Sequence, residues 1–178
     1  YDIGYGKFDH HQPDARVRDN GLKYASFGLL FDYYGKELLE QLEVEDIDTV
    51  KKAIEQDFII GIDAIDNGIF PTIDAPYKIK TTVDLIKLFN PAYKSNQDEN
   101  EQFLKAVSVA QTILSLEIER IIGKEKAKVK VLEEINKQNG PILVLDEYLP
   151  YEEVLLNTPK AKEILFVICP SNRGGYAI

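Results

Sequence analysis

Apolar residues recur at three- and four-residue intervals over much of this chain, a pattern that predicts α-helices. The first such stretch covers residues 24–34 and is expected to end at Gly35. A second helix is expected to begin near Thr49, with Asp48 as its N-cap, and to stop at Asn67-Gly68. Helices are thus predicted to follow one another through the first half of the chain.

The second half combines a long helix with short strands. A short helix is expected over residues 81–89, and the polar stretch 94–100 suits a linker. Periodicity then predicts the longest helix, over residues 103–136. A strand, a helix and two further strands are predicted after it, over residues 142–145, 151–156, 164–168 and 176–178. We therefore predict an α/β protein with two domains, residues 1–93 and 94–178, in which a long connecting helix leads into the smaller domain.

Composition is that of a globular protein. With 178 residues, of which 44% are hydrophobic and 29% charged, the chain can bury one sizeable core or two small ones. Its apolar runs are far too short to cross a bilayer, so we expect no membrane partner and a cytoplasmic location. The single Cys169 is expected to be a buried, unreactive thiol. The sequence has no signature of an oligomeric state.

A formal net charge of −9 argues against a protein that grips long duplexes, because such nucleases present broad basic surfaces. A short or single-stranded phosphoester substrate stays compatible with this charge if bound divalent ions neutralise phosphate locally. Five cations near the candidate motifs could add positive potential, although each is expected to be a solvated surface charge: Arg16, Arg18, Lys23, Lys78 and Lys80.

Both histidines of the chain stand together in Asp9-His10-His11, and a further carboxylate, Asp2, precedes them. Neutral imidazole and ionised carboxylate are the usual ligands of Mn²⁺ and Zn²⁺. Two short extended segments joined by a Gly4-Tyr5-Gly6 turn would bring Asp2 back beside His10. Adjacent histidines in a solvated loop are the alternative, but the two carboxylates and the glycine turn favour a metal-dependent hydrolase.

Asp63 and Asp66 lie in an otherwise apolar stretch of the predicted second helix. Their spacing of three residues places them on one face, and two buried carboxylates are costly without a cation or hydrogen-bond donors. We predict that Asp63 binds metal and that Asp66 supports the Asn67-Gly68 turn. The alternative is that Asp66 belongs only to the helix-terminal turn and Asp63 is an ordinary exposed charge.

Several separated motifs closely resemble the Myg family, named after a melanocyte-proliferating-gene protein and described as predicted metal-dependent hydrolases. The likeness runs in order over nearly the whole chain. The motifs are DIG-x-G-x-FDHHQ at 2–12, YASFGL at 24–29, DAIDNG at 63–68, FNP at 89–91, ILVLD at 142–146 and PSNRGG at 170–175.

This family in turn resembles the DHH phosphoesterase superfamily, whose members include exonucleases and manganese pyrophosphatases. The resemblance implies that Asp2 bridges two metal ions, that His10 is a ligand, and that Asp63 or Asp66 completes the set. It also implies a catalytic pair, in which His11 contacts metal or phosphate and Asp9 orients the histidines. The fold it implies is a parallel-sheet domain followed by a smaller α/β domain.

The superfamily supplies further ligands from a His-x-Asp or Asp-x-Asp motif ahead of the residue that matches Asp2. This chain opens at Tyr1 and contains no methionine. We therefore expect the sequence to be part of a longer protein, with the N-terminal part of the first domain missing and the second domain cut short.

Arg173-Gly174-Gly175 follows a predicted strand and is a candidate substrate-binding loop. Paired glycines let a backbone approach a ligand, and a guanidinium can grip phosphate through two hydrogen bonds. The segment looks like the glycine-containing loop of DHH enzymes, although it lacks that loop's usual histidine. The alternative is a simple hairpin turn with a solvated arginine.

The functional hypothesis is a phosphoesterase that uses two divalent cations, expected to be Mn²⁺, to cleave short or single-stranded nucleic acid, with RNA as the preferred substrate. That the substrate is nucleic acid rests on the resemblance alone. One alternative is hydrolysis of a small phosphorylated compound, such as pyrophosphate or a cyclic dinucleotide. The other is a noncatalytic scaffold that retains a vestigial metal site.

Overall fold

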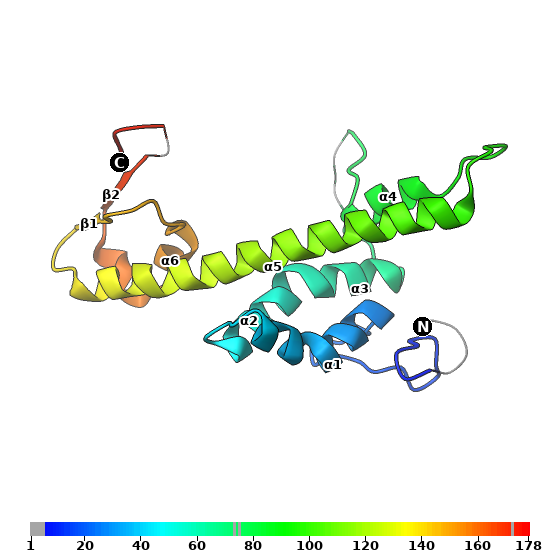
Figure 1. Cartoon of the computed structure of the whole chain (residues 1–178). Coiled ribbons are helices and arrows are strands. Elements are labelled where there is room, and N and C mark those ends of the chain that lie inside the picture. Colours follow the sequence, from blue (N-terminus) through cyan, green and yellow to red (C-terminus); the bar gives the residue numbers. More distant parts are fainter. Residues whose placement is uncertain (1–5, 73, 75, 172) are drawn as a thin grey trace. The chain divides into compact units, whose positions relative to one another are not determined.

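The computed structural model describes residues 6–72, 74, 76–171 and 173–178, which form a mixed α/β structure (Figure 1). The chain divides into two compact units, Tyr1–Glu119 and Arg120–Ile178. The first unit is helical where it is described, and the second contains a small sheet.

Helix α1, Ser26–Gln41, is the first element of the first unit. It confirms the predicted helix but continues through Gly35, so the prediction that Gly35 ends it is wrong. Gly35 is buried, and a Cβ at this position would meet the Phe31 ring at 3.1 Å. The glycine therefore makes room for an aromatic side chain one turn earlier instead of ending the helix.

Helices α2, Ile47–Ile54, and α3, Ile60–Asp66, form one continuous rod with a π-helical turn, η1, at Glu55–Ile59 between them. Asp46, and not the predicted Asp48, caps α2 by accepting a hydrogen bond from the Thr49 amide. The helix begins two residues earlier than predicted, so Asp46 precedes its first turn and Asp48 lies inside it. The predicted stop at Asn67-Gly68 is confirmed, with Gly68 at φ +81°.

Helix α4, Thr82–Ile86, and the 3₁₀ turn η2, Lys87–Phe89, confirm the short helix predicted before Asn90-Pro91. Thr81 and Asp84 form a capping box.

The predicted extended segment after Gly6 is wrong at Lys7-Phe8, which form a turn closed by the Asp9 amide and the Gly6 carbonyl at 3.0 Å. Gly4 and Tyr5 of the predicted glycine turn lie outside the described residues. Within residues 6–72, 74 and 76–119, the one strand-like pairing is an isolated bridge between Val17 and Lys23, so these residues do not show the expected parallel sheet.

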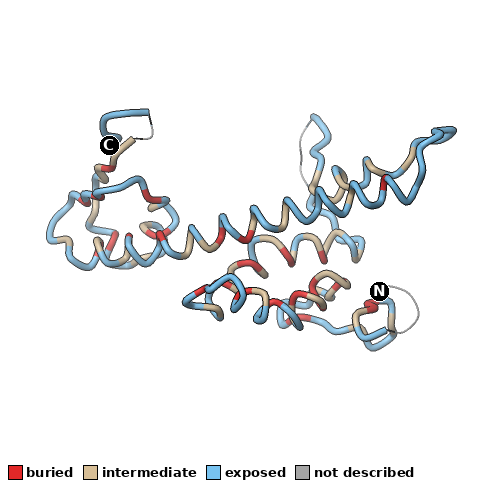
Figure 2. Tube along the Cα trace, viewed as in Figure 1, coloured by how far each residue is buried: buried red, intermediate tan, exposed pale blue. Residues whose placement is uncertain are grey.

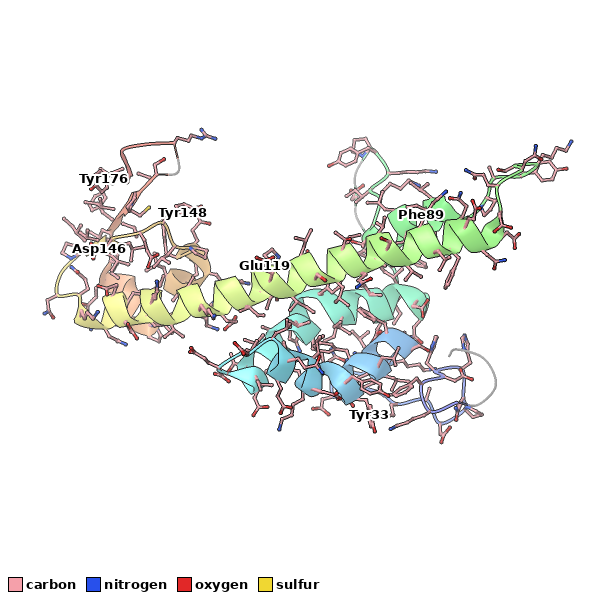
Figure 3. All side chains as sticks on the ribbon, viewed as in Figure 1. Tyr33, Phe89, Glu119, Asp146, Tyr148 and Tyr176 are labelled. Atoms are coloured by element: carbon pink, nitrogen blue, oxygen red, sulfur yellow. The ribbon has the colours of Figure 1, made fainter. Side chains whose placement is uncertain are left out.

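Helix α5, Glu99–Lys137, confirms the long helix and crosses the division between the units, near Glu119 (Figure 3). The units thus divide inside this helix, whereas the sequence places a domain boundary at 93–94; that boundary stays a prediction. None of the helices in the described residues is both long and apolar enough to span a membrane.

The second unit confirms the predicted β-α-β alternation. Strand β1, Ile142–Val144, pairs in parallel with β2, Phe166–Pro170, and helix α6, Glu152–Asn157, and the 3₁₀ turn η3, Pro159–Glu163, lie between them in sequence. Strand β3, Tyr176–Ala177, adds to β2 in antiparallel orientation, giving the order β1-β2-β3. The core consists of Ala127, Val131, Ile135, Leu143, Leu145, Leu149, Val154, Ala161 and Cys169. Cys169 is buried, as predicted.

Candidate metal centre

His10 is buried in the first unit and held from one side by the start of α1. Its Nδ1 lies 3.2 Å from the Ser26 amide and 3.3 Å from Ser26 Oγ. The hydroxyl in turn donates to the Phe8 carbonyl at 2.5 Å, so its lone pairs face the imidazole. The Ser26 amide N–H donates to Nδ1, so this nitrogen is an acceptor and the ring is fixed with Nε2 on the opposite edge, toward Asp66.

Asp66, in the last turn of α3, faces the other side of the His10 ring. Its Oδ2 lies 3.6 Å from Nε2, and its side chain is about half exposed, at 53%. Two ligands of a tetrahedral cation, each about 2.1 Å away, are separated by about 3.4 Å. An imidazole nitrogen and a carboxylate oxygen at this spacing fit a divalent cation of the Mn²⁺ or Zn²⁺ class.

Asp9 and His11 form a second pair beside the first. Asp9 Oδ1 accepts a hydrogen bond from the His11 amide at 2.9 Å and lies 3.2 Å from His11 Nδ1. The Asp9 carboxylate is buried, while the His11 side chain is 64% exposed. The rings of His10 and His11 are 4.1 Å apart. Asp9 thus fixes His11 in an orientation that leaves the far edge of its ring accessible.

Asp63, which lies one turn before Asp66 on α3, has a different environment. It is fully buried, and its Oδ2 accepts a hydrogen bond from Arg18 Nη2 at 2.6 Å. Its Oδ1 accepts from the Gly28 amide, in the first turn of α1, at 3.0 Å. Ala25, the N-cap residue of α1, makes no side-chain capping bond, so Asp63 satisfies this helix terminus from a distant element.

Arg18 is the centre of this buried network and is held over the Tyr24 ring at 3.7 Å. Its Nε donates to Glu55 at 2.9 Å, and its side chain is only 5% exposed. Burial favours the neutral guanidine, but hydrogen bonds to Glu55 and Asp63 prevail and raise the pKa of Arg18. Burial raises the pKa of Asp63, and the Arg18 hydrogen bond acts against that rise. The expectation that Arg18 is a solvated surface charge is therefore wrong.

The structure brings together His10 and Asp66, with Asp9 and His11 adjoining. Asp2, the predicted bridging ligand, lies outside the described residues. In the described part of the chain, no group of three or more His, Cys, Asp or Glu side chains is arranged to hold a metal ion. Which of Asp63 and Asp66 binds metal stays a prediction, but the geometry favours Asp66, since both oxygens of Asp63 have protein partners.

The predicted substrate loop is a tight hairpin between β2 and β3. Its Gly174 and Gly175 have φ values of +89° and +73°, which other residues rarely adopt. Two of its amides are used internally, because Gly174 donates to the Ser171 carbonyl and Arg173 to Ser171 Oγ. Asn172 lies outside the described residues. Arg173 is exposed, and because it belongs to the other unit, its expected approach to His10 and His11 stays a prediction.

Sequence reasoning missed three residues that organise the site: Arg18, Ser26 and Gly28. A buried carboxylate in an apolar stretch signals a cationic partner elsewhere, but periodicity gives no means of choosing among the cations. A glycine within a helical pattern signals close packing, and Gly28 has that role.

Comparison with known proteins places the chain in one family. Residues 1–178 match the MYG1_exonuc family, described as "Uncharacterised protein family (UPF0160)". A MYG1 protein of Schizosaccharomyces pombe is 27% identical over 176 residues, covering 88% of this chain and 54% of the relative. The MYG1 exonuclease of Mus musculus is 29% identical over 122 residues, covering 59% of this chain and 32% of the relative.

The chain thus spans about half the length of the S. pombe relative, and of a Dictyostelium discoideum MYG1 protein that is 25% identical to it. No solved structure matches the chain significantly. Because the family match covers all of it, the chain belongs to the MYG1_exonuc family.

Proposed function

We propose that the chain contributes a DHH-type metal centre to an exonuclease that hydrolyses phosphodiesters. The observation that carries this proposal is the approach of His10 Nε2 and Asp66 Oδ2 to 3.6 Å, beside the Asp9–His11 pair. Imidazole and carboxylate donors that face one another in a partly open site are suited to holding a cation.

The substrate that we propose is short or single-stranded nucleic acid, with RNA preferred. Support comes from mammalian relatives that carry the name MYG1 exonuclease, and from the charge of −9, which disfavours a grip on long duplexes.

His10 and Asp66, together with Asp2, would hold the metal ions. Two divalent cations, Mn²⁺ in this proposal, would lower the pKa of a bound water and neutralise charge on the phosphate oxygens. Ser26 keeps the His10 ring in place, because its backbone N–H donates to Nδ1. Asp66 is the more exposed of the two candidate ligands and would adjust as a substrate binds.

His11 would act on the substrate directly. Asp9 binds its Nδ1 edge, which directs Nε2 outward to contact a phosphate oxygen or transfer a proton to the leaving oxygen. The buried Asp9 carboxylate would stabilise the imidazolium form that such a transfer requires.

The test is hydrolysis by the full-length protein, with Mn²⁺ or with chelator, of labelled RNA, single-stranded DNA and pyrophosphate in parallel. We expect Mn²⁺-dependent shortening of RNA from one end. Cleavage of pyrophosphate alone would instead support hydrolysis of a small phosphorylated compound. No metal binding and no hydrolysis would support a scaffold.

A further inference from the structure

We infer that Arg18 and Asp63 are positioning residues that set the approach of Asp66 to His10. The inference rests on the proposed metal centre and assigns Asp63 a role other than ligand. Three parts of the chain take part: the turn closed by the Val17–Lys23 bridge, which carries Arg18, the first turn of α1, and α3. Side chains fill the space between α1 and α3 (Figure 3), and buried segments of both helices face each other there (Figure 2).

The contacts form a closed loop around the candidate centre. The first turn of α1 binds His10 through Ser26 and, two residues later, binds Asp63 through the Gly28 amide. Helix α3 carries both Asp63 and Asp66, separated by one turn. The Asp63 hydrogen bond therefore fixes α3 against the same helix end that holds His10, and the distance between His10 and Asp66 follows from it.

Gly28 makes this arrangement possible. A Cβ at position 28 would collide with Asp63 Oδ2 and lie 2.7 Å from Arg18 Nη2. Glycine is thus the residue type that allows a carboxylate and a guanidinium to approach the α1 backbone so closely.

The π-helical turn η1 determines the directions in which Glu55 and Asp63, the two acidic partners of Arg18, point around the helix axis. In a regular α-helix, Glu55 and Asp63, eight residues apart, would point about 80° away from each other. A π turn inserts about one extra residue, which returns them to the same face. Arg18 binds both, through Nε and Nη2, and the rod is thereby locked in rotation as well as in position.

A purely stabilising role is a weaker explanation. A buried ion pair contributes little net stability compared with apolar side chains of similar volume, because both charges lose their hydration. An arginine fork that binds two carboxylates in fixed directions does define orientation. The candidate centre requires such orientation, because His10 lies in a loop and Asp66 at the end of a helix, and the two must face each other.

The test compares two glycine variants of the full-length protein, Gly28→Ala and Gly61→Ala. Gly61 also lies in a helix of this unit, but a Cβ there meets nothing within 4 Å, so it is a matched control. Mn²⁺ affinity is measured by electron paramagnetic resonance at a temperature where each variant is fully folded. We expect Gly28→Ala to raise the Kd for Mn²⁺ about tenfold, the effect typical of substitutions at residues that orient a metal ligand. Gly61→Ala should leave the Kd unchanged.

Because the added Cβ of Gly28→Ala collides with the buried Asp63 carboxylate and can prevent folding, Asp63→Asn provides a second measurement. We expect its Kd for Mn²⁺ to rise about tenfold, and kcat at saturating Mn²⁺ to stay within about twofold of wild type, since the ligands are intact. In the metal-free protein, the Ser26 amide should exchange faster with solvent in this variant, because the start of α1 has been loosened.

An unchanged Kd in both Gly28→Ala and Asp63→Asn would overturn the inference and leave the pair a stabilising contact. A loss of kcat in Asp63→Asn that saturating Mn²⁺ does not restore would also overturn it, by making Asp63 a ligand. Absence of Mn²⁺ binding by the wild-type protein would instead remove the proposed function, and the inference with it.

Discussion

The two units differ in what they bury. The core of the second unit is apolar, built from residues such as Val131, Ile135 and Leu143. In the described part of the chain, the buried charged residues and the buried histidine all lie in the first unit: Asp9, His10, Arg18 and Asp63. Burial of apolar surface stabilises a fold directly, whereas buried charges need partners to be tolerated at all. The proposed metal centre therefore lies in the unit whose interior is the more costly to assemble.

The largest effect should come from the residues proposed to bind metal in the first unit. We expect His10→Ala, Asp66→Asn and Asp2→Asn each to lower Mn²⁺-dependent hydrolysis by the full-length protein at least about 100-fold, because a ligand is lost. Circular dichroism should show that the variants stay folded. Asp48→Asn, at an exposed position on α2, is the matched control. Near-normal activity of Asp66→Asn together with inactive Asp63→Asn would restore the sequence-based choice between the two carboxylates.

Arg18→Met should have the next largest effect. Removing the cation leaves Asp63 and Glu55 without their partner, and breaking a buried ion pair in this way costs about 3–5 kcal/mol of unfolding free energy. Urea unfolding, followed through the exchange of α1 and α3 amides, measures the loss. A loss of unfolding free energy below about 1 kcal/mol would show that water reaches Arg18. The charged side chains of the first unit would then be less costly to bury than the comparison of the two units implies.

Leu143→Ala addresses the apolar side of the comparison. The side chain is 1% exposed, and truncating a buried leucine costs about 2–5 kcal/mol. We expect faster amide exchange in β1 and β2 with an unchanged Kd for Mn²⁺. Weaker Mn²⁺ binding would mean that the two units are energetically coupled.

Arg173→Ala should have the smallest effect. If Arg173 binds phosphate, losing a charged hydrogen bond should raise KM about tenfold without changing metal content. Lys162→Ala, which removes another exposed cation of the second unit, should leave KM unchanged. Equal KM values for both variants would identify the Arg173 hairpin as a simple turn.

Hydrophobic periodicity predicted most helices and the β-α-β alternation because those elements bury one face each. It failed at Gly35, where the absence of a side chain serves packing against Phe31 and not termination. The residue types of the candidate site were readable in Asp9-His10-His11 and in DAIDNG. The separate roles of Asp63 and Asp66 could not be read from the sequence, because they depend on long-range contacts. Asp63 lies beside Arg18, and Asp66 lies beside His10.

The π-helical turn has a consequence for reading the history of this family. An α-helix that gains one residue forms such a turn, which is rare in proteins. Relatives that lost it would show a single-position gap between the counterparts of Ile54 and Ile60, and a changed residue at the counterpart of Glu55 or Arg18. Alignments that close this gap by sliding the helix would equate Asp63 with the wrong neighbour and misassign the ligand.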